Sequence, residues 1–322
     1  MSSKPCFIHY LGPAGTHTNE AAKIFVELLG MTDVTYVAEP SIAQVIREVQ
    51  SADEKDMTVL GCVPLENSIQ GSVTMTWDRL MRAAYENGAS QAAALWNPSQ
   101  SSLETVAPRI ITALTMRINH YLLSTHDVDF KSISEVYSHP QALAQCKEWL
   151  EEHVPHAAQF AVASTADAAR QIAELGEPSK AAIGNKWAGQ LYNLRISHDP
   201  IQDTEGNATR FGLLSKSGYF IKGSKTYTEW TVAICLIGVQ NQPGGLLSAL
   251  KPFHDYGLNL TRIESRPVGD KLGTYVFYLD ITLAEDPRSD AYRKVWETVV
   301  SVLDDLQIEV VQLGVYPLIG RS

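Results

Sequence analysis

The sequence predicts an α/β protein with two consecutive α/β lobes and a smaller C-terminal domain of ferredoxin-like topology. Up to about residue 214, short apolar runs alternate with amphipathic helical patterns, which is typical of largely parallel strands joined by helices. From residue 230 the order becomes strand, helix, strand, strand, helix, strand, the βαββαβ arrangement that lays helices over an antiparallel sheet. Two α/β halves that flank a cleft resemble the type II periplasmic-binding-protein architecture.

The first lobe is predicted from apolar runs separated by helical patterns. Its expected elements are strand 6–11, helix 18–30, strand 33–38, helix 41–51 and strand 57–63. Ser41 and Gln44 have the spacing of a capping box, in which side chains and backbone satisfy each other's free groups at a helix start. Residues 85–108 are small, polar and turn-forming, and we expect a surface loop there.

The second lobe and the C-terminal domain follow the same logic. The second lobe is expected to contain strands 110–118 and 133–137, helix 140–153, strand 158–162, helix 165–176 and strand 180–184. The C-terminal domain is expected to contain strand 230–237, helix 245–256, strands 258–268 and 273–283, helix 288–304 and strand 307–316. A Ser-, Gly- and Lys-rich stretch separates the two parts. We therefore predict domains at 1–218 and 229–322 with a linker at 219–228.

Composition excludes several classes of protein. Hydrophobic residues make up 45% and charged residues 19% of the 322 residues. No apolar run reaches the roughly 18–20 residues of a membrane-spanning helix, so no membrane partner is expected. The net charge is −10 and basic runs are missing from the sequence, which argues against a nucleic-acid partner. An anionic substrate would be repelled at long range and must be held by local donors.

The N-terminus and the cysteines bear on location. The apolar run 6–11 is too short and unsuitably flanked for a signal peptide, so we expect a cytoplasmic protein. Cys6, Cys62, Cys146 and Cys235 lie far apart in apolar or helical stretches, and we expect buried free thiols.

Four polar segments fall where predicted strands end, the edge at which open parallel sheets bind ligands. They are Gly12–Thr18, Pro64–Gly71, Ser138–Gln141 and Asn207–Phe211. In the first, backbone N–H groups and the Thr16 hydroxyl could hold a carboxylate, or the segment is an ordinary capped turn; it lacks the Gly-Lys-Ser/Thr of a P-loop. The Glu66-Asn67-Ser68 stretch could line a pocket or form a turn.

The other two segments are equally ambiguous by themselves. Ser138 precedes Pro140 as a helix N-cap would, and Gln141 and Gln145 share one face of the helix that follows. Ser138 and its neighbour His139 point apart at a helix start, which excludes a Ser-His nucleophile. Alternation along a strand puts Asn207, Thr209 and Phe211 on one face and Arg210 on the other.

Taken together, in this order and spacing, the four segments resemble the prephenate dehydratase family. The family's hallmark Thr-Arg-Phe element is matched by Thr209, Arg210 and Phe211. Further matches are Ser138–Cys146, Glu66-Asn67-Ser68 and Ile201-Gln202-Asp203. Two features depart from the family pattern: residues 85–108 resemble an insertion, and Ala113 stands where relatives commonly have a glutamate.

The resemblance implies an enzyme that removes CO2 and water from prephenate to give phenylpyruvate in phenylalanine biosynthesis. It implies Thr209 as the catalytic proton donor, and it implies no cofactor and no metal. The implied substrate-binding residues are Thr16, Glu66, Asn67, Ser138, Gln141, Gln145, Asn207, Arg210 and Phe211. Because alternation points Arg210 away from Thr209, an internal ion pair that locks the strand is an equal alternative for this residue.

The C-terminal region resembles an ACT domain, a small-molecule sensor that commonly binds amino acids at a dimer interface. The implied phenylalanine-binding residues are Gly244, Gly245, Leu246, Leu247, Asn259, Leu260, Thr261, Glu264, Ser265 and Arg266. Alternatively, the glycines mark an ordinary turn and the leucines the core face of a helix. The resemblance implies feedback regulation by L-phenylalanine and a homodimer or homotetramer formed through the ACT and catalytic domains.

Two other functions stay open at this point. Arogenate, which carries an amino acid in place of the keto acid of prephenate, is an alternative substrate. A non-catalytic two-lobed small-molecule-binding protein is the alternative outside enzymes.

Overall fold

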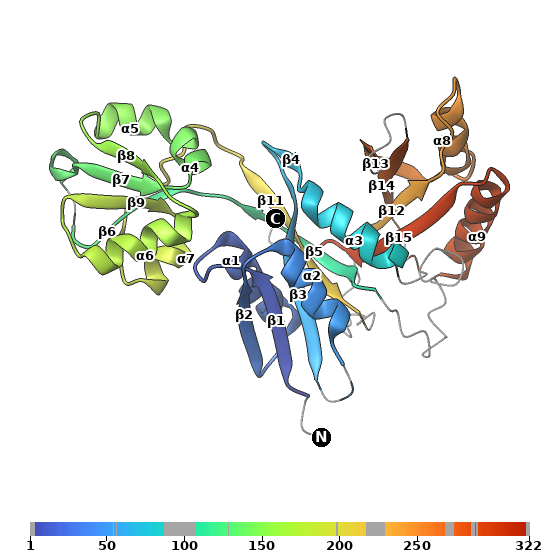
Figure 1. Ribbon diagram of the computed structural model, residues 1–322, viewed down its shortest axis with the longest axis horizontal. Coiled ribbons are helices and arrows are strands. Elements are labelled where there is room, and N and C mark those ends of the chain that lie inside the picture. Colours follow the sequence, from blue (N-terminus) through green and yellow to red (C-terminus); the bar gives the residue numbers. More distant parts are fainter. Residues whose placement is uncertain are drawn as a thin grey trace.

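The computed structural model describes residues 4–53, 55, 57–86, 107–127, 129–197, 199–216, 229–267, 274–284, 287 and 289–319. It confirms the predicted fold class: two α/β lobes and a ferredoxin-like domain lie side by side, with the first lobe in the middle (Figure 1). Most of the predicted loop 85–108 and all of the predicted linker 219–228 lie outside these residues. Within them, no helix is long and apolar enough to cross a membrane.

The first lobe is a mixed sheet with helices on both faces. Its elements are β1 (Cys6–Leu11), α1 (His17–Leu29), β2 (Val34–Glu39), α2 (Ile42–Ser51), β3 (Thr58–Asn67), β4 (Gly71–Ser72), α3 (Thr74–Glu86), β5 (Arg109–Arg117) and β11 (Ala208–Ser215). The strand order is β5-β11-β3-β1-β2, with β1 parallel to β2 and β3. β11 runs antiparallel to both of its neighbours, because the chain leaves for the second lobe after β5 and returns along β11. The expectation of largely parallel strands therefore holds for β1, β2 and β3 in this lobe, and for β7, β8 and β9 in the second.

The second lobe contains a five-stranded sheet of order β10-β6-β9-β7-β8. Its elements are β6 (Tyr121–Ser124), the 3-10 turn Phe130–Ser132, β7 (Glu135–Ser138), α4 (Pro140–Gln145), α5 (Lys147–His153), β8 (Ala158–Ala161), α6 (Thr165–Leu175), β9 (Lys180–Gly184), α7 (Lys186–Leu191) and β10 (Arg195–Ile196). The single helix predicted over 140–153 is wrong, because two helices meet at Cys146. The Asp203 carboxylate causes the break by accepting hydrogen bonds from the N–H groups of Glu148 and Trp149, which makes a new helix start.

The C-terminal domain has the predicted topology. Its elements are β12 (Trp230–Ile237), α8 (Gly245–Asp255), β13 (Asn259–Pro267), β14 (Tyr275–Leu283), α9 (Asp290–Asp305) and β15 (Glu309–Pro317). The order β13-β14-β12-β15 leaves β13 at one edge, where β14 is its only partner among the described strands. Residues of α8 and α9 pack on one face of this sheet around Phe253 and Trp296. All four cysteines of the chain are buried and free, as predicted.

The C-terminal domain is joined to the first lobe by a shared sheet and a shared core. β15 pairs in parallel with β5 where Gly314 meets Ile110, so one ten-stranded sheet runs through both parts. A Cβ atom at position 314 would lie 2.5 Å from the carbonyl oxygen of Ile110, so only glycine permits this approach.

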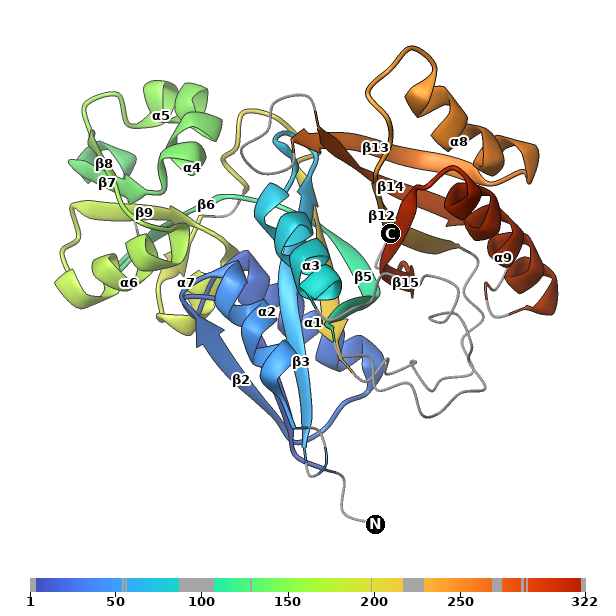
Figure 2. The same cartoon turned by 45° about the vertical axis from the view of Figure 1, so that its right-hand side comes forward.

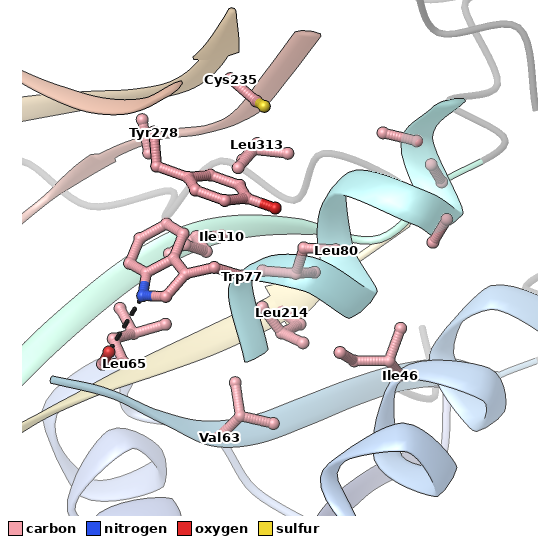
Figure 3. Packing of buried hydrophobic residues seen from close by; sticks show 14 of the residues in the cluster. Ile46, Val63, Leu65, Trp77, Leu80, Ile110, Leu214, Cys235, Tyr278 and Leu313 are labelled. Carbon is pink, nitrogen blue, oxygen red and sulfur yellow. Dashed lines mark hydrogen bonds between the residues drawn. The ribbon is translucent and has the colours of Figure 1, made fainter. Parts of the chain in front are cut away.

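Helix α3 lies at this junction (Figure 2), and its Trp77 packs in one hydrophobic cluster with Tyr278 of β14 (Figure 3). The indole of Trp77 donates a hydrogen bond to the carbonyl of Leu65 at 3.0 Å. The Arg262 guanidinium lies 3.8 Å from the centre of the Trp77 ring, and the Tyr278 hydroxyl donates to Asp78 at 2.9 Å. A movement of the C-terminal domain would therefore be transmitted to α3 through these contacts.

Candidate active site

A cavity of about 510 Å³ lies between the two lobes, within the volume range of small-molecule sites. The first lobe contributes the ends of β1 and β3 and the start of β11. The second lobe contributes the starts of α4 and α6. The lining residues are Leu11, Gly12, Thr16, His17, Thr18, Pro40, Pro64, Asn67, Gln70, Val73, Ile118, His120, His139, Gln141, Ala142, Gln145, Ala163, Ser164, Thr165, Asn207 and Thr209.

The lining carries no fixed charge. All of its residues belong to the described part of the chain, and none of them is Lys, Arg, Asp or Glu. Two helices, α1 and α6, begin at this wall with Thr16 and Ser164 as N-caps. Because helix N-termini carry partial positive charge and unpaired N–H groups, the wall favours an anionic ligand.

Thr209 is held as a hydrogen-bond donor toward the cavity. The side-chain oxygen of Asn67 accepts from the N–H groups of Ile69 (3.0 Å) and Gln70 (3.1 Å), which fixes the orientation of the amide. The amide nitrogen of Asn67 then donates to the Thr209 hydroxyl at 2.8 Å. Thr209 is 8% exposed. Since its oxygen accepts from Asn67, its own hydrogen is left to point toward a ligand.

A chain of amides continues from this pair into the second lobe. Asn67 also donates to the Asn207 side-chain oxygen at 2.8 Å. Asn207 in turn donates to the side-chain oxygen of Gln145 at 3.4 Å, and His120 shares that same oxygen at 2.8 Å through Nε2. The predicted residues Asn67, Gln145, Asn207 and Thr209 are thus brought together around one end of the cavity.

Two further predicted residues line the cavity in other ways. Thr16 caps α1: its hydroxyl donates to the carbonyl of Leu11 (3.1 Å) and accepts from the N–H of Asn19 (3.3 Å). Gln141 lies on α4, on the same helix face as Gln145, and both side chains line the cavity.

Ser138 and Phe211 do not line the cavity. The Ser138 hydroxyl is fully buried and donates to the carbonyl of Ile183 at 2.8 Å, which ties β7 to β9. The N-cap of α4 is His139, one residue later than the sequence suggested. Phe211 is 2% exposed and packs in the core beneath α1.

Glu66 and Arg210 point away from the cavity and pair with each other. Their closest nitrogen and oxygen are 3.5 Å apart, and both side chains are about one-third exposed at 37% and 34%. The two residues are register partners on β3 and β11, so alternation places both on the face opposite Thr209. This geometry is the internal ion pair that the sequence offered as the alternative for Arg210.

Sequence reasoning assigned no binding or catalytic role to the histidines of the cavity. His17, His120 and His139 all line it. Burial lowers the pKa of His120 to about 4, so its imidazole is neutral near pH 7. Its position just after β5, at the same sheet edge as Gly12–Thr18, Pro64–Gly71 and Asn207–Phe211, is the signal that could have identified it.

The predicted effector residues lie at the start of α8 and at both ends of β13. Gly244, with φ 83°, starts α8, and Gly245 follows. On β13, Ser265 lies level with the end of β12, since both Ser265 and Leu236 pair with Phe277. Asn259 lies level with the other end of β12. Within one chain, the start of α8 is therefore near Glu264–Arg266 and distant from Asn259–Thr261.

Side chains of the effector set differ in their contacts. Leu247 is 72% exposed and Leu246 is half-buried, so the two leucines do not form a common core face. Thr261 shares a hydrogen bond with Thr282 at 3.0 Å, whereas Leu260 packs on the core under the helices. Glu264 accepts hydrogen bonds from both Arg262 and Arg266 on the same strand.

The fold and the cavity define a two-lobed α/β protein of type II binding-protein architecture with an added ferredoxin-like domain. The family model "Prephenate dehydratase" matches residues 8–218, and the model "ACT domain" matches residues 233–290. The prephenate dehydratase of Methanocaldococcus jannaschii is 36% identical over 84% of this chain and 86% of that protein. The chain belongs to the prephenate dehydratase family.

Solved structures agree with this assignment. The prephenate dehydratase of Arthrobacter aurescens, solved in complex with L-Phe, has a TM-score of 0.73 and 26% identity. The match covers 97% of this chain and 90% of that one. The prephenate dehydratase of Staphylococcus aureus has a TM-score of 0.70 at 23% identity, covering 96% and 99%, and shares the fold.

Proposed function

We propose that this protein converts prephenate to phenylpyruvate, CO2 and hydroxide, as a step of phenylalanine biosynthesis. The observation that carries the proposal is the Thr209 hydroxyl, which Asn67 holds as a donor at the wall of an uncharged interlobe cavity. Membership of the prephenate dehydratase family supplies the reaction. The two helix N-termini at the wall suit a dianionic substrate.

Thr209 acts on the leaving group. As the bond between the ring carboxylate and the ring breaks, its electrons move into the ring and expel the hydroxyl at the opposite carbon as hydroxide. A hydrogen bond from Thr209 stabilises the charge that develops on this oxygen, and solvent supplies the proton that turns hydroxide into water. A positioned donor of this kind contributes about 10²–10⁴ in rate.

Loss of CO2 is favoured by the apolar part of the cavity. Leu11, Pro40, Val73 and Ile118 line it, among other apolar residues. A ring carboxylate placed against such residues loses its water shell, and this destabilises the charged ground state relative to the uncharged CO2 that forms.

Product analysis tests the proposal. Purified protein is incubated near neutral pH with prephenate and, separately, with arogenate, alongside samples without protein because prephenate aromatises unaided in acid. We expect phenylpyruvate from prephenate. Phenylalanine from arogenate alone would make the protein an arogenate dehydratase. If neither compound is consumed, the protein is a two-lobed binding protein and the enzymatic proposal is wrong.

L-Phenylalanine is the proposed effector, by analogy with the L-Phe complex of the Arthrobacter aurescens relative. The start of α8 supports an amino-acid site because its N-terminal N–H groups favour a carboxylate. We expect added L-phenylalanine to lower activity and to raise the unfolding temperature. No change in either quantity would refute this part of the proposal.

A homodimer through the β13 edges is the proposed assembly, and a homotetramer would add a contact between catalytic domains. Antiparallel pairing of two β13 edges would place the start of α8 of one subunit beside Asn259–Thr261 of the other, which completes the predicted effector set. Sedimentation measurements with and without L-phenylalanine test it: a monomer under both conditions would contradict the proposal. A cytoplasmic location fits four free, buried cysteines.

A further inference from the structure

Two histidines from different lobes meet at the wall of the cavity. His17 is the first residue of α1, and His120 lies between β5 and β6. Their ring centres are 6.2 Å apart with an edge-on arrangement. Each ring has one nitrogen bonded inside the protein, while Nε2 of His17 and Nδ1 of His120 are buried without a partner among the described residues. A ligand bound at this wall would supply hydrogen-bond partners for both nitrogens.

The free nitrogen of His17 is a donor. Asn185 accepts a hydrogen bond from the N–H of Ala188 at 2.7 Å through its side-chain oxygen, which fixes its amide. Its amide nitrogen therefore donates to Nδ1 of His17, at 3.3 Å. Because Nδ1 accepts, the ring hydrogen is on Nε2, the nitrogen without a partner.

The free nitrogen of His120 is an acceptor when its imidazole is neutral. Asn207 donates to the Gln145 side-chain oxygen, so His120 meets that same oxygen and its Nε2 must donate. His120 is 4% exposed, and burial lowers its pKa to about 4. Nδ1 therefore keeps a lone pair near pH 7, and it becomes a donor only when the ring takes up a proton.

We propose that Nε2 of His17 and Nδ1 of His120 together bind the carboxylate that the substrate keeps through the reaction, and that the bound carboxylate brings a proton to His120. This inference rests on the proposed function and names the substrate group that the two histidines hold. It accounts for a cavity wall that must take a dianion without a lysine or arginine.

The retained carboxylate fits this place better than the one that leaves as CO2. A cation beside the leaving carboxylate would hold the electrons that must move into the ring, and would oppose the loss of CO2. The side chain that bears the retained carboxylate starts at the ring carbon opposite the hydroxyl. Two amide side chains, Asn207 and Gln145, separate His120 from the Asn67–Thr209 pair, so the histidines lie away from the hydroxyl end.

The titratable side chains beside His120 in the described part of the chain come from α1 and from the start of α4. His17 faces it from α1, with the Glu20 carboxylate behind, 3.6 Å from Nδ1 of His17. His139 lines the same cavity from the start of α4. A proton on His17 would oppose one on His120, whereas the substrate carboxylate favours it, so substrate binding and protonation of His120 are coupled.

Steady-state kinetics of His17→Phe give the first test. Phenylalanine keeps a planar aromatic ring and removes the donor, so we expect KM for prephenate to rise about tenfold or more while kcat changes little. His126, exposed in the second lobe, supplies the control: His126→Gln should leave both constants unchanged. An unchanged KM in folded His17→Phe, or a loss confined to kcat, would overturn the proposal.

Calorimetry gives the second test and does not depend on turnover. Phenylpyruvate, which carries the retained carboxylate, is titrated into the protein near pH 7 in two buffers of different ionisation enthalpy. We expect proton uptake on binding in the natural chain and its loss in His120→Gln. Equal uptake in both proteins, or no uptake in the natural chain, would refute the role of His120. A natural chain that does not consume prephenate at all would refute the proposed function instead.

Discussion

The donor role of Thr209 leads to a prediction with two matched variants. Thr209→Val keeps the size of the side chain and removes the hydroxyl, whereas Thr209→Ser keeps the hydroxyl. Loss of a positioned donor should lower kcat for prephenate by about 10²–10⁴, with the serine variant retaining most activity. The Asn67 amide keeps Asn207 and the carbonyl of Ala208 as acceptors, at 2.8 and 3.2 Å. The stability lost should therefore be only about 1 kcal/mol.

A third variant tests the direction of the hydrogen bond. In Asn67→Asp the carboxylate cannot donate, so the Thr209 hydroxyl would turn its hydrogen toward position 67 and away from the substrate. We expect kcat to fall about as far as in Thr209→Val, with the circular dichroism spectrum unchanged. The assay is phenylpyruvate formation at saturating prephenate. A valine variant within about threefold of the natural kcat, or a serine variant as slow as valine, would show that the hydroxyl is not the donor.

Three further predictions concern stability, each measured by urea unfolding. The pKa of His120 is lowered to about 4 in the folded protein, so the unfolded chain binds the proton first as the pH drops. The free energy of unfolding should therefore fall by about 3 kcal/mol between about pH 6.5 and about pH 4. His120→Gln should remove this pH dependence. Gly314→Val should destabilise the junction by about 1–3 kcal/mol, because its Cβ would press on the Ile110 carbonyl; an unchanged midpoint would mean that the β5–β15 pairing is absent in solution. Arg262→Met should lower the free energy of unfolding by about 3–5 kcal/mol, because it leaves buried Asp280 unpaired. Adding Asp280→Leu should restore much of the lost stability, and additive losses in the double variant would contradict this explanation.

Elements that depend on local sequence patterns, such as apolar runs and capping residues, were predictable from the sequence. β9 and β12 have the predicted bounds, and Ser41 caps a helix as its spacing to Gln44 indicated. The helix over 140–153 was misjudged because Asp203, distant in sequence, caps its second half. Helix propensity depends on the local sequence, so it carries no information about a capping group that only tertiary folding brings to the helix.

The residues of the candidate site also divide into those that the sequence could predict and those that it could not. Alternation correctly separated Thr209 from Arg210, and the family pattern pointed to Asn67, Asn207 and Gln145. Neither could show that the Ser138 hydroxyl donates a hydrogen bond to the carbonyl of Ile183, because that contact depends on the pairing of β7 with β9.

The pairing of His17 with His120 was hidden for a related reason. The two residues come from different lobes, and only the tertiary fold brings their rings together. The position of His120 after a strand marks it as a candidate site residue, but the sequence could not show that its ring lies beside that of His17.

Three consecutive residues at the end of β3 link the cavity to the C-terminal domain. The Leu65 carbonyl accepts from the Trp77 indole, and Trp77 lies under Arg262 of the strand that carries the predicted effector residues. Glu66 pairs with Arg210, and Asn67 orients Thr209. A shift of β13 that moved Trp77 would pull on β3 two residues before the Asn67 amide that orients the Thr209 hydroxyl. Because hydrogen-bond catalysis depends steeply on geometry, a small displacement there is sufficient to lower activity without closing the cavity.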